Sequence, residues 1–437
     1  MTPLKYGDQS WPCPLPGATV LTPPRPARLP EPAAAIGAAL TAPIGTPPLA
    51  GVVAPGERVV IVTSDITRYT GSELYLPLLV DELNRCGIGD ADLEILVGLG
   101  IHRAQTAAEH RRIAGDLYGR IRVIDHDCDD PEQLVDLGRT AGGLPVQVNR
   151  RVMEADRVIV TGTIGLHYFA GFGGGRKGLV PGVASRATCM ATHFAIFNPP
   201  EIGGRHPAAR PGNLAGNPVH AAILAAARMV APDLLLNTVL TADKRIAGIF
   251  CGDLEQAHLA GCALAKELHT VPLAQPFDLA VISCGGHPKD INFIQAHKAL
   301  DYGVQAVKPG GTVILLAACP DGFGNPTFFD WFRFQDLAEF EVALRARYEI
   351  NGQTAYATLS KARTWRIILV SAFSAEQTAQ MGMEKAADLD QALRMAYERL
   401  PAAAETVIIP DGGTLLPIIK TREPQFVIRE PYQGTCL

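Results

Sequence analysis

A glycine-rich stretch at residues 167–182, HYFAGFGGGRKGLVPG, places a histidine, an arginine and a lysine on an unusually permissive backbone. Glycine adopts conformations closed to other residues and lets a ligand approach the main-chain amides. A run such as Gly173, Gly174 and Gly175 beside Lys177 is typical of a phosphate cradle. It is not a Walker motif, because no Ser or Thr follows the lysine. A tight structural turn is the alternative, and phosphate binding alone leaves the histidine without a role.

Three histidines stand out by position. His102 and His167 each directly follow a predicted strand, and His193 lies beyond the lysine on a predicted helix. Converging imidazoles would suit zinc or nickel. The sequence alone does not show that the three converge, so a shared metal site and separate roles both stay open. Most other histidines, His258 among them, lie on predicted helices or loops and are predicted to be structural.

Short apolar runs, which predict strands, alternate along the chain with stretches of helical periodicity. The runs lie at residues 58–65, 93–100, 120–127, 156–163, 277–286, 312–319, 366–373 and 406–413. This alternation predicts an α/β fold of two domains, residues 1–272 and 273–437, each a mostly parallel, Rossmann-like sheet flanked by helices. The Pro- and Ala-rich first fifty residues predict irregular surface chain around at most one short helix.

Polar residues follow the predicted strands where ligands bind in open α/β sheets, beyond the carboxyl ends. Asp65 and Arg68 follow the first strand, and His102 follows the next. In the second domain Gln295 and Lys298 are three residues apart, on one face of a helix. A solvated helix face is the alternative there. We expect Arg68 and Lys298, one from each domain, to hold a carboxylate across an interdomain cleft.

Composition narrows the class of partner. The chain has 437 residues, with 39 Lys and Arg against 44 Asp and Glu, and no basic cluster that would indicate a nucleic-acid partner. Its first residues lack the apolar run of a signal peptide, and no stretch is long enough to span a membrane, so we expect neither feature. Nine scattered cysteines without C-x-x-C spacing predict reduced thiols and a cytoplasmic location. A small-molecule ligand is the predicted partner, and a homo-oligomer stays open.

In combination, these residues resemble the nickel-pincer-dependent lactate racemase family. The resemblance rests on motifs in the family's order: SDITR (64–68), GIHR (100–103), GLHYFAGFGGGRKGLVPG (165–182), His193 and GGHPKDINFIQAHKAL (285–300). It covers most of the chain from about residue 58 to residue 300. The final third has fewer distinguishing residues.

The resemblance implies a covalently held cofactor, the nickel-pincer nucleotide (nickel with a pyridinium-3,5-bisthiocarboxylic acid mononucleotide). Lys177 would be its attachment point and His193 a nickel ligand, while Gly173–Gly175 and the strand ends would hold its phosphate. Asp65 would lie at the cofactor or orient a catalytic group. Loading implies transient contact with cofactor-synthesis enzymes, and a protein expressed without them would be an empty apoprotein.

The resemblance also implies the reaction, inversion of the C2 centre of a 2-hydroxy acid. The α-hydrogen would leave as hydride to the cofactor while a histidine takes the hydroxyl proton, giving a 2-keto acid. His102 and His167 would each serve one enantiomer, since an ordinary imidazole titrates near pH 6.5. Arg68 and Lys298 would hold the carboxylate, and Gln295 would add a hydrogen bond.

Two departures from the family pattern leave the substrate open. Tyr69 follows Arg68 and Arg176 precedes Lys177, and an extra tyrosine or arginine near the pocket would accept a larger or more polar hydroxy acid. Lactate-like, malate-like and sugar-acid substrates therefore all stay open. Trp331 and Trp365 are available as pocket walls. A non-catalytic module that binds a phosphorylated molecule is the alternative function, although it leaves the paired histidines unexplained. A zinc hydrolase would need an H-E-x-x-H pair, which the sequence lacks.

Overall fold

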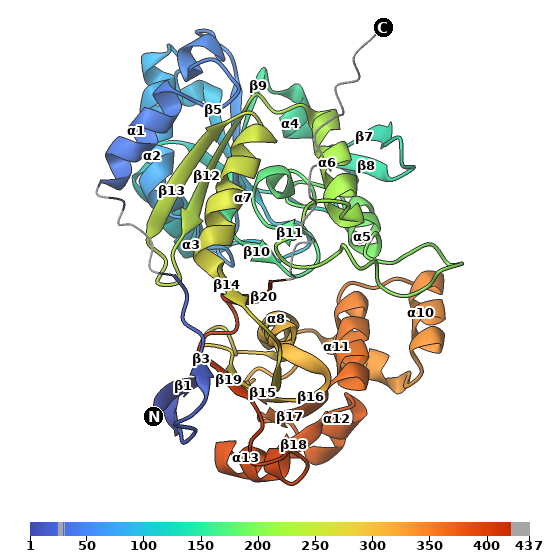
Figure 1. Cartoon of the computed structure of the whole chain (residues 1–437). Helices are drawn as coiled ribbons and strands as arrows, with labels where there is room; N and C mark the ends of the chain where they lie inside the picture. The colour runs from blue at the N-terminus through green and yellow to red at the C-terminus, as the bar shows by residue number, and fades with distance from the viewer. Residues whose placement is uncertain (25–28, 30, 421–437) are drawn as a thin grey trace, which may run out of the picture.

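The computed structural model describes residues 1–24, 29 and 31–420; Cys436 and the end of the predicted second domain lie outside these ranges. Two six-stranded sheets flanked by helices dominate the fold (Figure 1), which confirms the predicted α/β architecture. The eight cysteines in these ranges are free thiols. In the described part of the chain, no helix is long and apolar enough to cross a membrane.

The first sheet has the strand order β13-β12-β9-β4-β5-β6 and is parallel except for β13. Its strands are β4 (Val59–Ser64), β5 (Leu93–Gly98), β6 (Arg122–Asp125), β9 (Arg157–Ile164), β12 (Leu234–Leu240) and β13 (Ile246–Gly252). Its helices are α1 (Pro32–Thr41), α2 (Ser72–Arg85), α3 (Ala107–Ala114), α5 (Arg186–Phe194), α6 (Pro218–Val230) and α7 (Gln256–His269). Central strands are covered on both faces and therefore appear in the sequence as unbroken apolar runs. The antiparallel hairpin of β12 and β13 was not predicted.

The second sheet is parallel throughout, in the order β18-β17-β16-β15-β19-β3. Its strands are β3 (Thr19–Val20), β15 (Phe277–Ser283), β16 (Val307–Leu316), β17 (Arg366–Val370), β18 (Glu384–Ala386) and β19 (Thr406–Ile409). Its helices are α8 (Phe293–Gly303), α12 (Ala375–Gln380) and α13 (Leu389–Tyr397), with α9 (Pro326–Asp330), α10 (Leu337–Ala346) and α11 (Gly352–Thr364) inserted between β16 and β17.

The N-terminal segment packs with the second sheet, which corrects its assignment to the first domain. Strand β3 pairs with β19, and Leu4 and Cys13 of the hairpin β1 (Thr2–Tyr6) and β2 (Gln9–Cys13) share a buried cluster with Leu279 of β15. A two-residue strand carries no periodic pattern, so this long-range pairing could not be recognised in the sequence. The predicted boundary near residue 273 falls at the end of β14 (Thr270–Leu273), which pairs with β20 (Leu416–Ile419).

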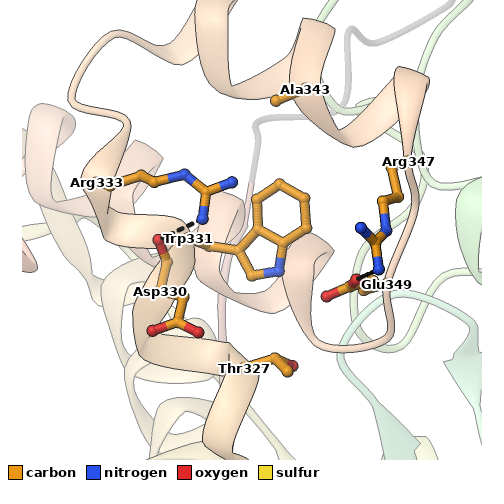
Figure 2. A pocket seen from close by; sticks show the side chains of 7 residues that line it. All are labelled: Thr327, Asp330, Trp331, Arg333, Ala343, Arg347 and Glu349. Atoms are coloured by element: carbon orange, nitrogen blue, oxygen red, sulfur yellow. Dashed lines mark hydrogen bonds and ion pairs between the residues drawn. The ribbon is translucent and has the colours of Figure 1, made fainter.

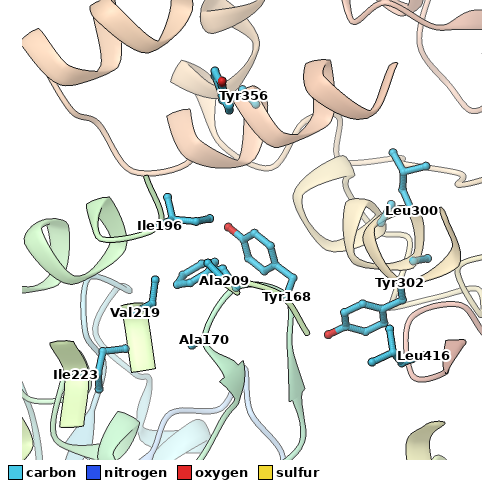
Figure 3. Close-up of a cluster of buried hydrophobic side chains, with 14 of the residues drawn as sticks. Tyr168, Ala170, Ile196, Ala209, Val219, Ile223, Leu300, Tyr302, Tyr356 and Leu416 are labelled. Atoms are coloured by element: carbon cyan, nitrogen blue, oxygen red, sulfur yellow. The ribbon is translucent and has the colours of Figure 1, made fainter. Parts of the chain in front are cut away.

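The two domains share one buried cluster. Figure 3 shows Tyr168 and Ile196 from the first domain opposite Leu300, Tyr302 and Tyr356 from the second. The strand ends of the first sheet therefore face the second domain, and residues of both can reach one site.

Candidate active site

One aromatic ring joins three of the predicted site residues. Phe169 lies in the turn between β10 (Leu166–His167) and β11 (Gly171–Phe172). Its ring centroid is 4.5 Å from that of His167 and 5.1 Å from that of His193, and the Nζ atom of Lys177 lies 5.8 Å from it. The structure therefore gathers these three side chains in one place.

Charges from both domains act on His167. Burial lowers the pKa of His167 well below its ordinary value, and the neighbouring basic groups of Lys177, His193, Arg68 and Lys298 lower it further. Since Lys298 lies on α8 of the second domain and the other three lie on the first, groups of both domains affect this ring. The imidazole of His167 is neutral in this setting, which is the form that accepts a proton.

Lys177 is a partly buried amine that forms no ion pair with any residue the structure describes. Its Nζ atom has no hydrogen-bond partner within the described ranges. Burial lowers its pKa to about 7, and the neighbouring charges of Arg176 and Arg68 contribute. Near neutral pH a large share of Lys177 is therefore uncharged, as a nucleophilic amine must be.

His193 is oriented by its own helix. Ser185 caps the N-terminus of α5 by accepting from the amide of Thr188. One turn before the histidine, the carbonyl oxygen of Cys189 accepts a hydrogen bond from His193 Nδ1 at 2.7 Å. Burial and the charge of Lys177 lower the pKa of His193 to about 4. The neutral ring therefore presents the Nε2 lone pair, the arrangement found in metal-binding histidines.

His102 is paired with a buried carboxylate. Its Nδ1 lies 2.5 Å from Oδ2 of Asp65, which is 3% exposed, while Thr67 Oγ1 donates to the other carboxylate oxygen at 2.7 Å. Burial alone would raise the pKa of Asp65, but the hydrogen bond and charge of His102 bring it below its ordinary value. Asp65 is therefore placed to orient His102. A bond from Gly100 N to Gly182 O, 2.8 Å, ties this loop to the end of the glycine-rich stretch.

Helix α8 supplies the side chains of the second domain. Asn292 caps the helix by accepting from the amide of Gln295. Lys298 Nζ donates to Gln295 Oε1 at 2.7 Å, so these two side chains lie together on one face. Burial lowers the pKa of Lys298 to about 7, and the charge of Arg68 adds to the effect. The charges of Arg68 on the first domain and Lys298 on the second therefore influence each other.

The glycine run packs against the protein interior, which corrects much of its predicted role. The amide of Gly173 donates to Gly165 O at 2.8 Å, and that of Gly175 donates to Asn237 Oδ1 at 2.6 Å. A Cβ at Gly175, whose φ is +53°, would lie 2.5 Å from the ring of His258. These two amides are therefore not available to a phosphate, and the predicted contact remains open only for Gly174.

Comparison with known proteins identifies the family of this chain. The chain is 33% identical to the lactate racemase of Thermoanaerobacterium thermosaccharolyticum, covering 86% of this chain and 88% of that protein. It is 35% identical to the lactate racemase of Lactiplantibacillus plantarum, covering 85% and 87%. Residues 6–203 match the model of the lactate racemase N-terminal domain, and residues 273–416 that of the C-terminal domain. The chain belongs to the lactate racemase family.

Solved structures show the same fold. The lactate racemase apoprotein of Thermoanaerobacterium thermosaccharolyticum superposes with a TM-score of 0.84 at 31% identity, covering 95% of this chain and 99% of that chain. A protein of Thermotoga maritima superposes with a TM-score of 0.61 at 20% identity, covering 83% and 94%, which shows a shared fold alone.

The side chains at the two departures from the family pattern are engaged in other contacts. Arg176 is 1% exposed and bonds to His258 Nε2 and to the carbonyl oxygen of Ala170, both at 2.9 Å. His258, predicted to be unremarkable, is thus a buried support of the glycine-rich stretch. The hydroxyl of Tyr69 donates to Glu73 Oε1 at 2.7 Å. Neither Arg176 nor Tyr69 is directed at the site, so neither argues for a larger substrate.

The tryptophans are also placed elsewhere. Trp365 Nε1 donates to Val307 O at 3.2 Å. Trp331 borders a separate cavity of about 330 Å³ in the helical insertion, with Arg333 and Arg347 on either side of the indole (Figure 2). No contact joins either indole to the site residues in the described structure.

A polar network behind the site joins the domains of this family member, and sequence reasoning missed it. The hydroxyl of Tyr168 lies 2.8 Å from Thr354 Oγ1 on α11. Asp301 of α8 binds Lys361 Nζ at 2.5 Å and the guanidinium of Arg205 at 3.4 Å. Thr354 and Lys361 lie in the insertion, where no motif marked them, and only the fold brings them beside α8.

Proposed function

We propose that this protein is an isomerase that inverts the C2 centre of a 2-hydroxy acid, using a nickel-pincer nucleotide attached to Lys177. The grouping of Lys177, His167 and His193 around Phe169 carries this proposal. The relatives named lactate racemase make lactate the first substrate to test, followed by malate and sugar acids.

The residues present fit the proposed cofactor. The amine of Lys177 has no partner in the described structure and is partly neutral near pH 7, as covalent attachment requires. Because Nδ1 of His193 donates to the carbonyl oxygen of Cys189, its Nε2 atom carries the lone pair that can bind a metal, and neutral imidazole is a good nickel ligand. When bound, the nickel nucleotide supplies an acceptor for the C2 hydrogen together with its electron pair.

The chain's own residues bind the substrate and move its hydroxyl proton. Arg68 and Lys298 hold the carboxylate between the two domains, which fixes the C2 carbon. His102, whose Nδ1–H is directed at Asp65, offers Nε2 as the base for one enantiomer. His167 accepts the proton from the other enantiomer, because its buried ring is neutral. When the hydrogen returns to the opposite face of C2, the histidine that serves that enantiomer donates the proton to the hydroxyl oxygen, so each turnover uses both histidines.

Expression together with the cofactor-synthesis enzymes tests the proposal. Intact mass and peptide mapping should find an adduct at Lys177, and a chiral assay should show racemisation of lactate, malate or a sugar acid. Lys177→Ala should lose both adduct and turnover, while Lys266→Ala, at an exposed position on α7, should keep both. An unmodified Lys177 under these conditions would refute the proposal. An adduct without turnover of any hydroxy acid would identify a binding module instead.

A further inference from the structure

Helix α8 presents a third polar side chain in line with Gln295 and Lys298. The intervals of three and four residues place Gln295, Lys298 and Tyr302 along one stripe of the helix. Tyr302 is 2% exposed. Figure 3 shows its ring projecting from α8 towards the first domain, on the side where Tyr168 lies. Tyr302 therefore belongs to the face of α8 that meets the site.

The hydroxyl of Tyr302 lacks a partner within the described ranges, although buried phenols ordinarily have one. The buried Tyr168 and the partly buried Tyr348 both have partners, since Tyr168 bonds to Thr354 and Tyr348 donates to Gln353, each at 2.8 Å. The Tyr302 hydroxyl oxygen is also not fully enclosed by protein atoms. It therefore opens onto space that a bound molecule can reach.

The charges around Tyr302 indicate what that molecule would be. Burial raises the pKa of Tyr302, the charge of Asp301 adds to the rise, and the charge of Arg68 opposes it. The phenol is thus a hydrogen-bond donor at working pH and lies within electrostatic reach of Arg68. Oδ1 of Asp301 is occupied by the ion pair with Lys361. Arg68, Lys298 and Tyr302 together form a set of donors, which suits an anion.

We infer that the Tyr302 hydroxyl donates a hydrogen bond to the carboxylate of the bound 2-hydroxy acid, beside Arg68 and Lys298. The inference rests on the proposed function for the identity of the anion. It assigns a substrate-binding role to a residue that no motif in the sequence marked. A carboxylate offers two oxygens with about four acceptor sites, so three donors can bind it at once.

Tyr302→Phe removes the hydroxyl and keeps the ring. In the loaded enzyme the KM for lactate should rise about tenfold, the loss typical of one hydrogen bond to a charged group, with kcat nearly unchanged. The matched control is Tyr397→Phe on α13, whose hydroxyl lies 3.4 Å from Thr406 Oγ1. The control should leave KM unchanged, and both variants should keep the thermal midpoint of the wild type.

Two further measurements isolate the contact. Glycerate differs from lactate only by a hydroxyl on C3, so an equal rise in KM for both substrates supports a contact with the carboxylate. A rise confined to glycerate would overturn it, as would an unchanged KM for both.

Oxamate binding to the apoprotein, measured by calorimetry, should weaken about tenfold in Tyr302→Phe. This measurement uses the protein without its cofactor, so absence of racemase activity would refute the proposed function without touching the inference, whereas unchanged oxamate affinity would refute the inference alone.

Discussion

His193 donates its Nδ1–H to the carbonyl oxygen of Cys189, one helical turn earlier, at 2.7 Å. This bond fixes the tautomer and leaves Nε2 as the only coordinating atom of the ring. His193→Ala should therefore abolish nickel retention while leaving covalent attachment at Lys177 intact. Metal analysis and intact mass on the same sample measure the two separately. Nickel bound in proportion to the adduct in this variant would show that His193 is not a ligand.

The pairing of Asp65 with His102 predicts a catalytic effect without loss of binding. Asp65→Asn replaces an acceptor by an amide, which favours the His102 tautomer that carries its proton on Nε2 and cannot act as a base. We expect kcat to fall by about 10² to 10⁴ in both directions, because each turnover needs both histidines. Progress curves started from each pure enantiomer measure this. Wild-type kcat would exclude an orienting role for Asp65.

Anion binding to the apoprotein should depend on pH through Lys298. Burial and the charge of Arg68 lower its pKa to about 7, so the amine loses its charge as the pH rises through that value. Oxamate should therefore bind more tightly at pH 6 than at pH 8. In Arg68→Gln the midpoint should shift upward, because a neighbouring positive charge is removed. Calorimetric titrations across this range test the sign, and tighter binding at higher pH would contradict it.

The buried ion pairs of Asp301, one of which joins the two domains, predict a loss of stability when they are removed. Asp301→Asn leaves the charges of Lys361 and Arg205 without their shared carboxylate, which should lower the free energy of unfolding by about 3 to 5 kcal/mol. Urea denaturation measures this. The control is Asp243→Asn, since the exposed pair of Asp243 with Arg245 should contribute less than about 1 kcal/mol. Similar losses in the two variants would rule out a buried interdomain link.

The sequence predicts the parts of this fold that local patterns encode. The central strands are buried on both faces, so each appears as an apolar run, and the rule that ligands bind at strand ends then picks out Asp65, Arg68, His102 and His167. The α8 pair was recognisable from helical spacing. These residues could be grouped because a parallel sheet brings its carboxyl ends to one edge.

Features set by contacts distant in sequence could not be predicted. Strand β3 is two residues long, and its partner β19 lies nearly four hundred residues away. Tyr302 looks like an ordinary core residue until the fold turns its stripe of α8 towards Arg68. The sequence predicts that the glycine run is a ligand cradle. Its interior neighbours, Asn237 on β12 and His258 on α7, are distant in sequence and therefore could not be recognised.

The packing of Gly175 gives a last prediction. A Cβ there would lie 2.5 Å from the His258 ring at a φ of +53°, so Gly175→Ala adds a clash to backbone strain. Gly138→Ala is the matched control, because its φ is +82° and a Cβ would meet nothing within 4 Å. Strain alone should cost each variant about 1 to 3 kcal/mol of unfolding free energy, and the clash should add about as much again at Gly175.

Since Lys177 is two residues away, Gly175→Ala should also lower the yield of its adduct during co-expression with the cofactor-synthesis enzymes, whereas Gly138→Ala should not. Denaturation curves and intact mass supply the two readouts. Equal losses of stability in the two variants would mean that His258 yields to the added methyl group. The glycine run would then owe its composition to backbone conformation alone, and not to the closeness of α7.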